Sequence, residues 1–406
     1  MELNYNLLKN IETEYGESFY LLNSEQFKQN YLELINAFRK IYPNTYIAYS
    51  YKTNYTPTLC KIIDNLGGYA EVVSEMEYEI AKRIGVAPNK IIFNGPCKNQ
   101  SAIKEVLLAG GCVNVDNIEE MHYIETIAEE NKNIELNIGI RCNFEINDNV
   151  LSRFGVDVLS EDFAYISDAL KRHHNLVLSE MHCHFASRKL ETWAPRADVM
   201  ISLTRGIGRV PDKIDLGGGL FGKMADSLKE QFDSYIPEYI EYAQAVAPQF
   251  EEAFGNFDKK PKLVIEPGSA LVGDCMKFAA KVKSIKNIRG KYIATVLGSI
   301  YNINPTLNKK NPPVEIYSNT DGKEYNDLDF GGFTCIESDY LYRHYDGKLS
   351  VGDYVVFGNV GSYSVVLKPP FILPNFAVVD CSGEDGKIKL IKRQETFDDI
   401  FHTFEF

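Results

Sequence analysis

Eight short apolar runs, separated by longer amphipathic segments, constrain the fold of this chain more than any other feature. The runs are YIAYSY (46–51), YAEVV (69–73), KIIFN (90–94), CVNV (112–115), IELNIGIRC (134–142), LVLSEMHCH (176–184), KIDLGGG (213–219) and KLVIEPG (262–268). Runs of this length are typical of buried strands, and the segments between them have helical length and pattern. Eight strand–helix units in about 230 residues have the count and size of a (β/α)8 barrel. We therefore predict an α/β fold built on a TIM barrel.

The helices of this barrel are predicted at 56–66, 74–85, 117–132 and 225–247, among others. After residue 270 the pattern changes to strand-like runs with turn signals, at 277–299, 352–359 and 376–393. Within the last of these, GEDG (383–386) marks a hairpin. This part of the chain is predicted to form a C-terminal antiparallel β domain.

Charge and composition exclude several classes of function. A net charge of −13, without a concentrated basic stretch, argues against a nucleic-acid partner. There is no signal-like N-terminal segment and no apolar run of about 18 residues, so we expect no membrane span and a cytoplasmic location. Eight cysteines without CxxC spacing indicate reduced thiols rather than a zinc site or a disulfide framework.

His182 and His184 form an HxH pair, which on a strand would place both rings on one face, as in some metal sites. No matching group of ligands stands out elsewhere in the sequence. We therefore predict no metal.

The carboxyl ends of the predicted strands carry unusual residues, and in TIM barrels the active site lies at that end. Each has an ordinary explanation when taken alone: a solvated lysine, a flexible glycine loop, a turn or a hydrogen-bonded core histidine. Together they collect an amine, cations, a glycine run and a carboxylate at one mouth. The residues are Lys52, Arg141, His184, Gly217, Gly218, Gly219 and Glu266.

This combination suits pyridoxal 5'-phosphate (PLP). Lys52 offers an amine for covalent attachment, and burial and neighbours are expected to lower its pKa. The glycine run after the seventh strand lets backbone N–H groups approach a phosphate closely. Glu266 would keep the pyridine nitrogen protonated, so that the ring withdraws electrons.

Several motifs occur in a characteristic order: YSYKTN, GGYAEVVSEMEYE, IIFNGPCK, SRFGVD, HCHFAS, DLGGG, EPG, TCIESD and VGSY. In these motifs, over essentially its whole length, the chain resembles the fold-type III PLP-dependent decarboxylases. That group contains the diaminopimelate and ornithine decarboxylases and has an alanine-racemase-like barrel. The resemblance implies a barrel over residues 25–270, with residues 1–24 (including SFYLLN) and 271–406 forming the β domain.

The resemblance also implies residue roles. Lys52 would hold the cofactor covalently, His184 would stack on its ring and Glu266 would pair with its pyridine nitrogen. Cys335, contributed by the β domain of a second subunit, would protonate the substrate carbon after CO2 leaves, so a homodimer with shared active sites is expected. The phosphate would be bound by Ser187, Gly217, Gly218, Gly219 and Tyr363, with further cofactor contacts from Glu71, Arg141 and Gly268.

At several positions where family members bind the side chain of their substrate, this chain has a different residue. Ser269 and Asn304 stand where diaminopimelate decarboxylases have arginines, and neither replaces a bidentate contact to a distal carboxylate. Ile336 stands where family members that bind a distal ammonium have an acidic residue, although Glu337 could substitute. Arg188 replaces a usual glutamine and is either a surface residue or a relocated carboxylate clamp. Arg188, Asn304, Ile336 and Glu337 are therefore the candidate substrate-binding positions.

Three functions fit these observations. The first is α-decarboxylation of a non-standard or conjugated amino acid, as in siderophore or other specialised metabolism. The second is a PLP-dependent racemase or epimerase, which needs a second base opposite Lys52, such as Cys335 or a tyrosine. The third is a non-catalytic cofactor-binding protein. The presence of Cys335 and Asp339 together with Lys52 favours catalysis.

Overall fold

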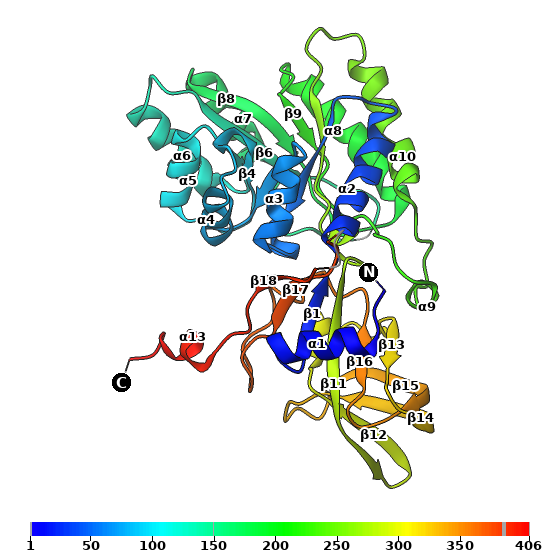
Figure 1. Cartoon of the computed structure of the whole chain (residues 1–406). Helices are drawn as coiled ribbons and strands as arrows, with labels where there is room; N and C mark the ends of the chain where they lie inside the picture. Colours follow the sequence, from blue (N-terminus) through cyan, green and yellow to red (C-terminus); the bar gives the residue numbers. More distant parts are fainter. Residues whose placement is uncertain (1, 149, 384–386, 406) are drawn as a thin grey trace. The chain divides into compact units, whose positions relative to one another are not determined.

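The structure is a computed structural model, and it describes residues 2–148, 150–383 and 387–405 (Figure 1). The chain forms two compact units. The barrel unit comprises Lys28–Phe221 and Ser234–Ala270. The β unit comprises Met1–Phe27, Gly222–Asp233 and Leu271–Phe406.

The barrel unit contains a closed ring of eight parallel strands, because β5 pairs with β6 to complete the sheet. The strands, in ring order, are β2 (Thr45–Ser50), β3 (Tyr69–Val72), β4 (Ile91–Phe93), β5 (Cys112–Val115), β6 (Leu136–Asn143), β8 (Leu176–His182), β9 (Lys213–Asp215) and β10 (Lys262–Ile265). A two-residue strand, β7 (Val156–Asp157), adds to β6. Each strand overlaps one of the eight predicted runs, so the predicted TIM barrel is confirmed.

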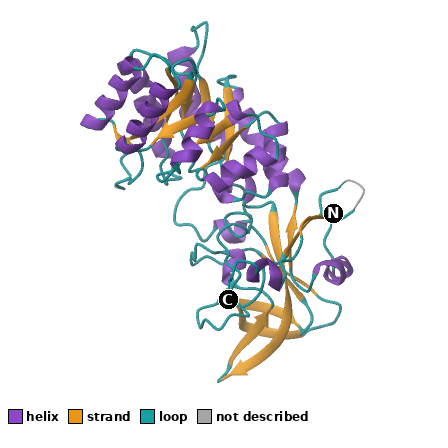
Figure 2. Cartoon of the chain, turned by 90° about the vertical axis from the view of Figure 1, so that its left-hand side faces the viewer, coloured by secondary structure: helices purple, strands orange, loops and turns teal. Residues whose placement is uncertain are grey.

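Helices cover the outside of these strands (Figure 2). Several begin at side chains that cap the first turn: Ser74 accepts a hydrogen bond from the backbone of Glu77, and Asn117 from that of Glu120. The helices are α2 (Ser24–Arg39), α3 (Pro57–Asn65), α4 (Glu75–Arg83), α5 (Gln100–Leu108), α6 (Ile118–Glu130), α7 (Glu161–Arg172), α8 (Trp193–Ile207) and α10 (Tyr239–Phe254).

The prediction of a single helix at 225–247 is wrong. The segment contains a one-turn helix, α9 (Asp226–Lys229), and then α10, which begins at Tyr239. Pro237 has no backbone N–H to donate and disfavours a helical conformation at the residue before it, which separates the two helices. Glu238 and Glu241 then start α10 with a capping box.

The β unit is a mixed, mostly antiparallel sheet. Its N-terminal strand β1 (Phe19–Leu22) pairs antiparallel with β11 and parallel with β17, so strands from both ends of the chain lie side by side (Figure 1). A second parallel pair joins β12 and β14. The other strands and helices are α1 (Tyr5–Tyr15), α11 (Ser269–Val272), β11 (Met276–Ile288), β12 (Lys291–Val296), α12 (Ile300–Ile303), β13 (Val314–Tyr317), β14 (Lys323–Gly331), β15 (Tyr340–Leu349), β16 (Tyr354–Phe357), β17 (Ala377–Asp380), β18 (Lys389–Lys392) and α13 (Phe397–Phe401).

The predicted β domain is therefore present. The strands β17 and β18 pair antiparallel, and residues 384–386 of the GEDG hairpin signal between them lie outside the described residues. Among the residues that the structure describes, no helix is long and apolar enough to span a membrane.

Candidate active site

Lys52 lies in a single 3-10 turn (Tyr51–Thr53) that follows β2, at the carboxyl end of the strand. Its Nζ atom is 2.6 Å from Oε2 of Glu71, a fully buried residue of β3, while the lysine side chain is 32% exposed. Burial lowers the pKa of Lys52, but the charges of Glu71 and Glu266 and the hydrogen bond to Glu71 raise it by more. The expected lowering of this pKa is therefore wrong, because two carboxylates face the amine.

Glu266 follows β10 and is 2% exposed. Its Oε1 accepts a hydrogen bond from Nδ2 of Asn94 at 2.7 Å, and its Oε2 lies 3.3 Å from Nε2 of His182 and 3.6 Å from Nδ1 of His184. Burial raises the pKa of the Glu266 carboxyl, but the two histidines and the charge of Lys52 bring it well below its usual value. Glu266 is thus a buried, ionised carboxylate.

A chain of amide side chains continues from Glu266 across the interior of the barrel. Asn94 also donates to Oε1 of Glu71 at 3.1 Å and accepts from Asn114 at 2.7 Å. Asn114 in turn donates to Oε1 of Glu180 at 2.5 Å, and Nζ of Lys213 lies 3.2 Å from the other Glu180 oxygen. This network was not predicted from the sequence. The polar residue at the end of IIFN and the one inside CVNV were the available signals.

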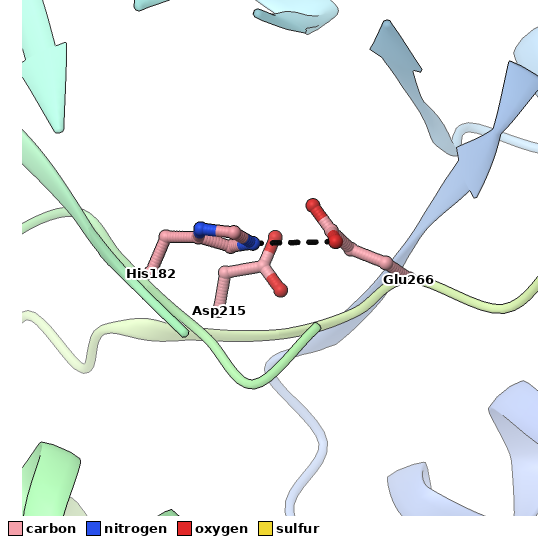
Figure 3. A group of neighbouring side chains, drawn as sticks. All are labelled: His182, Asp215 and Glu266. Carbon is pink, nitrogen blue, oxygen red and sulfur yellow. Dashed lines mark hydrogen bonds and ion pairs between the residues drawn. The ribbon is translucent and has the colours of Figure 1, made fainter. Parts of the chain in front are cut away.

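His182, Asp215 and Glu266 point toward one another from the ends of three adjacent strands (Figure 3). Their ligand-type atoms all lie within 4.8 Å of one another, a spacing that would suit a metal ion. Burial and the charges of Glu266 and Glu180 raise the pKa of Asp215 well above its usual value, so this carboxyl holds a proton. Both oxygens of Glu266 already face nitrogen atoms, those of Asn94 and His182.

His184 connects this cluster to the glycine run. Its Nδ1 accepts a hydrogen bond from the backbone N–H of Gly218 at 2.9 Å, and 26% of the side chain is exposed. Burial lowers the pKa of His184 to about 4. The imidazole is therefore neutral near pH 7.

The three glycines are required because the backbone around them is crowded. Gly217 and Gly219 have φ angles of 69° and 93°, which L side chains rarely adopt. A Cβ atom on Gly218 would lie 2.6 Å from the carbonyl oxygen of Glu266, and one on Gly219 would lie 2.5 Å from that of Ser187. Gly268 has the same role in EPG, since a Cβ there would collide with Thr53 beside Lys52.

The backbone N–H groups of Arg188, Gly219 and Leu220 are among those in this region that donate no hydrogen bond within the described residues. Unpaired N–H groups on neighbouring loops are the donors that a phosphate needs. They accompany a lysine amine, a neutral histidine ring and an ionised carboxylate. The residues of the barrel unit therefore fit PLP.

Arg141 and Arg188 are the two cations predicted near this mouth. Arg141, in β6, is buried beside His182 of β8; its Nη1 lies 3.6 Å from Asp116, and its guanidinium packs on Phe154. Arg188 is half-buried, with its guanidinium carbon 5.4 Å from the centre of the Phe221 ring. No ion pair joins Arg188 to a carboxylate in the described part of the chain.

The remaining predicted site residues belong to the β unit. Cys335, Ile336 and Glu337 are exposed, in a loop whose ends are held by the buried carboxylate of Asp339. This carboxylate accepts hydrogen bonds from the hydroxyl of Thr334 at 2.6 Å and from the backbone of Ile300 at 2.7 Å. The loop that carries Cys335 is thereby tied to the start of α12.

Asn304 and Tyr363 occupy two other loops of the β unit. The side-chain amide of Asn304 donates to the backbone of Asn308 at 2.7 Å and accepts from its side chain at 2.8 Å, so it holds its own loop. Tyr363 has a φ angle of 65°, and its loop packs so closely on α11 that a Cβ on Gly361 would collide with the carbonyl of Val272. The predicted roles of both residues stay predictions.

A parallel eight-stranded barrel with a lysine after its first strand, a glycine loop after its seventh and a carboxylate after its eighth defines a fold-type III PLP enzyme. Residues 29–273 match the family model described as pyridoxal-dependent decarboxylase, pyridoxal binding domain. The chain therefore belongs to the pyridoxal-dependent decarboxylase family, as the resemblance indicated.

Individual relatives and solved structures agree with this assignment. The chain is 26% identical to a diaminopimelate decarboxylase of Aquifex aeolicus, over 97% of this chain and 93% of that one. It is 25% identical to the L-glutamyl-[BtrI acyl-carrier protein] decarboxylase of Niallia circulans, over 98% and 95%. The crystal structure of a diaminopimelate decarboxylase from M. jannaschi superposes with a TM-score of 0.86 at 25% identity, covering 98% of this chain and 94% of that one.

Proposed function

We propose that this decarboxylase removes the α-carboxylate of a non-standard or conjugated amino acid, rather than of diaminopimelate or ornithine. The observation that carries the proposal is that Lys52, Glu266 and the glycine run suit PLP, while uncharged residues stand where the relatives have charged residues for those two substrates. Ser269, Asn304 and Ile336 occupy the positions concerned.

When bound, PLP supplies a ring that accepts the electron pair released as the carboxylate leaves. Lys52 would hold the cofactor covalently through its Nζ atom. The ionised Glu266 keeps a proton on the pyridine nitrogen, and the neutral His184 ring presents a flat face for stacking. Ser187 and the glycine run would orient the phosphate, and the contact expected from Tyr363 rests on the resemblance alone. Cys335 of a second subunit would deliver a proton from Sγ to the α-carbon, so the active unit would be a homodimer.

The proposal also concerns the side chain of the substrate. Asn304 is uncharged and hydrogen-bonded within its own loop, so it does not replace an arginine. Ile336 offers no charge to an ammonium group, and Arg188 has no carboxylate partner in the part of the chain that the structure describes. A conjugated substrate carrying a carboxylate agrees with these residues and with the similarity to the carrier-protein glutamyl decarboxylase.

The test is mass spectrometry of the PLP-loaded protein in heavy water with a pool of amino acids, polyamine precursors and carboxylated conjugates. We expect one compound to lose CO2 and to gain one non-exchangeable deuterium at the α-carbon, and a Lys52→Ala control to leave the pool unchanged. Deuterium entering a substrate that keeps its carboxylate would instead identify a racemase or epimerase. A protein that binds PLP stably and changes no compound would support the non-catalytic alternative.

Arg188→Gln, which restores the residue usual in the family, tests the proposed clamp on the compound identified. If Arg188 binds a carboxylate of the substrate, this variant raises KM for that compound while kcat changes less. An unchanged KM would show that Arg188 is a surface residue and that the side chain is recognised elsewhere.

A further inference from the structure

Arg196, on the first turns of α8, is a fully buried arginine that joins the two loops at the PLP-binding end of the barrel. Its Nη1 donates to the carbonyl oxygen of Gly218 at 2.8 Å, and its Nη2 donates to that of Ser187 at 2.7 Å. The guanidinium carbon lies 4.6 Å from the ring centre of Trp193 and 5.5 Å from that of Phe185. Arg196 is thus held by stacking, and its planar fork fixes one carbonyl on each loop.

Two neighbouring side chains hold adjacent carbonyl groups from the same side. Nε1 of Trp193 donates to the carbonyl of Gly219 at 3.3 Å, and the hydroxyl of Tyr242 on α10 donates to that of Arg188 at 2.7 Å. Four backbone carbonyls, two on each loop, therefore point toward α8 and α10.

These contacts decide where the amides of the two loops point. In a trans peptide the C=O and the following N–H point in opposite directions, and the described residues contain no cis peptide. The carbonyls of Ser187, Gly218 and Gly219 are held by Arg196 and Trp193, so the next N–H groups point away from α8. These are the N–H groups of Arg188, Gly219 and Leu220, which have no hydrogen-bond acceptor within the described residues.

The guanidinium of Arg196 is held by backbone carbonyls rather than by a carboxylate, and Asp148 acts on it only through its charge. Within the described residues no ion pair joins its guanidinium to a carboxylate, and its Nε has no acceptor. Burial lowers the pKa of Arg196 to about 10, which still leaves it protonated near neutral pH. A buried, unpaired cation is costly, so an anion bound on the far side of the two peptide groups would be strongly favoured.

We propose that Arg196, together with Trp193, is a positioning residue that builds the phosphate site: it turns three N–H groups toward the phosphate of PLP and supplies the positive charge behind them. This inference rests on the proposed binding of PLP. It assigns to α8 a role that none of the motifs in the sequence revealed.

The test compares PLP with pyridoxal, which lacks the phosphate, on protein stripped of cofactor with hydroxylamine. Arg196→Lys keeps the charge but removes the planar fork that spans the two carbonyls, so we expect the Kd for PLP to rise about 10- to 100-fold, the effect of losing a charged hydrogen bond. The Kd for pyridoxal should change less than about twofold, because the contacts to the ring are kept. Arg205→Lys, an exposed position on the same helix, is the matched control and should leave both values unchanged.

A second measurement separates positioning from general stability. Inorganic phosphate should raise the Tm of the stripped wild-type protein and raise it less in Arg196→Lys. The proposal would be overturned if Arg196→Lys lost affinity for PLP and for pyridoxal equally. It would also be overturned if phosphate raised the Tm of Arg196→Lys as much as that of wild type. If Arg196→Lys does not fold, Trp193→Phe decides, because it removes the hydrogen bond to the carbonyl of Gly219 but keeps an aromatic ring beside Arg196, and it should weaken PLP binding more than pyridoxal binding. A wild-type protein that binds neither PLP nor pyridoxal would refute the proposed function itself.

Discussion

The two sides of the barrel mouth bind opposite charges by different means. On the carboxylate side, Glu71 and Glu266 are buried side chains whose oxygens face Lys52, Asn94 and His182. On the amide side, around the glycine run, the ligand groups are backbone N–H groups, and the carbonyls behind them are held by Arg196 and Trp193.

The difference follows from the cost of burying each kind of group. A carboxylate kept in a barrel interior has to be satisfied by donors within the protein, so the carboxylate side is internally complete. Unpaired backbone N–H groups on loops at the mouth cost less, and they can be left to bind a ligand. We therefore expect the carboxylate side to set the protonation of the site and the amide side to set its affinity for an anion.

The largest effect is expected from removing the amine of Lys52, which contacts Glu71 on the carboxylate side. Lys52→Ala removes the group that holds the cofactor, and turnover should fall by more than about 10³-fold. Steady-state assays of CO2 release measure this, with circular dichroism to show that the fold is kept. Turnover within tenfold of wild type would break the assignment of the chemistry to this side.

Glu266→Gln should lower kcat by about 10²- to 10³-fold, because a neutral amide cannot stabilise a protonated pyridine nitrogen. The affinity of the Glu266→Gln protein for inorganic phosphate should stay unchanged, since the amide side is intact. Full turnover in this variant would show that the carboxylate does not act on the ring. A loss of phosphate binding would show that the two sides are not separate.

His184 contacts both sides and predicts a pH-dependent stability. Its pKa is about 4 in the folded protein, below the value of about 6.5 for a free histidine, so the unfolded chain binds more protons between these pH values. The free energy of unfolding should therefore keep its full value above pH 6.5. As the pH falls from 6.5 to 4, protonation of this histidine in the unfolded chain should lower it by about 3 kcal/mol.

Denaturant titrations of the cofactor-free protein at several pH values measure this loss. His184→Phe should show a smaller decrease between pH 6.5 and 4 than wild type, and His402→Phe, at an exposed position, should behave as wild type. If His184→Phe loses stability as steeply as wild type, the acid sensitivity belongs to other groups.

The smallest expected effect is on the amine of Lys52. Glu71→Gln removes the nearest of the carboxylates that raise the pKa of Lys52, so this pKa should fall. The pH dependence of Lys52 labelling by an amine-reactive reagent, read by peptide mass spectrometry, reports the shift. Glu75→Gln, an exposed acid on α4, is the control. An unchanged profile would mean that Glu71 is not the group that holds the amine charged.

Much of the fold could be predicted from the chain alone, and the exceptions have local causes. The eight barrel strands were predictable because buried parallel strands are short apolar runs with helical segments between them. The break between α9 and α10 was missed because an apolar-periodic segment was given more weight than Pro237. The hydrogen-bonded pair Asn94 and Asn114 was missed because two asparagines far apart in sequence meet only when the barrel closes.

The sequence by itself determined which residues end the strands of this barrel, and hence that Lys52, the glycine run and Glu266 lie at one mouth, because strand order and side-chain alternation are local properties. Only the tertiary structure decided how these groups are tuned. Glu71 and Glu266 raise the pKa of Lys52, and Arg196 turns amides on two loops toward one site, because both effects depend on side chains brought together from separate strands and helices.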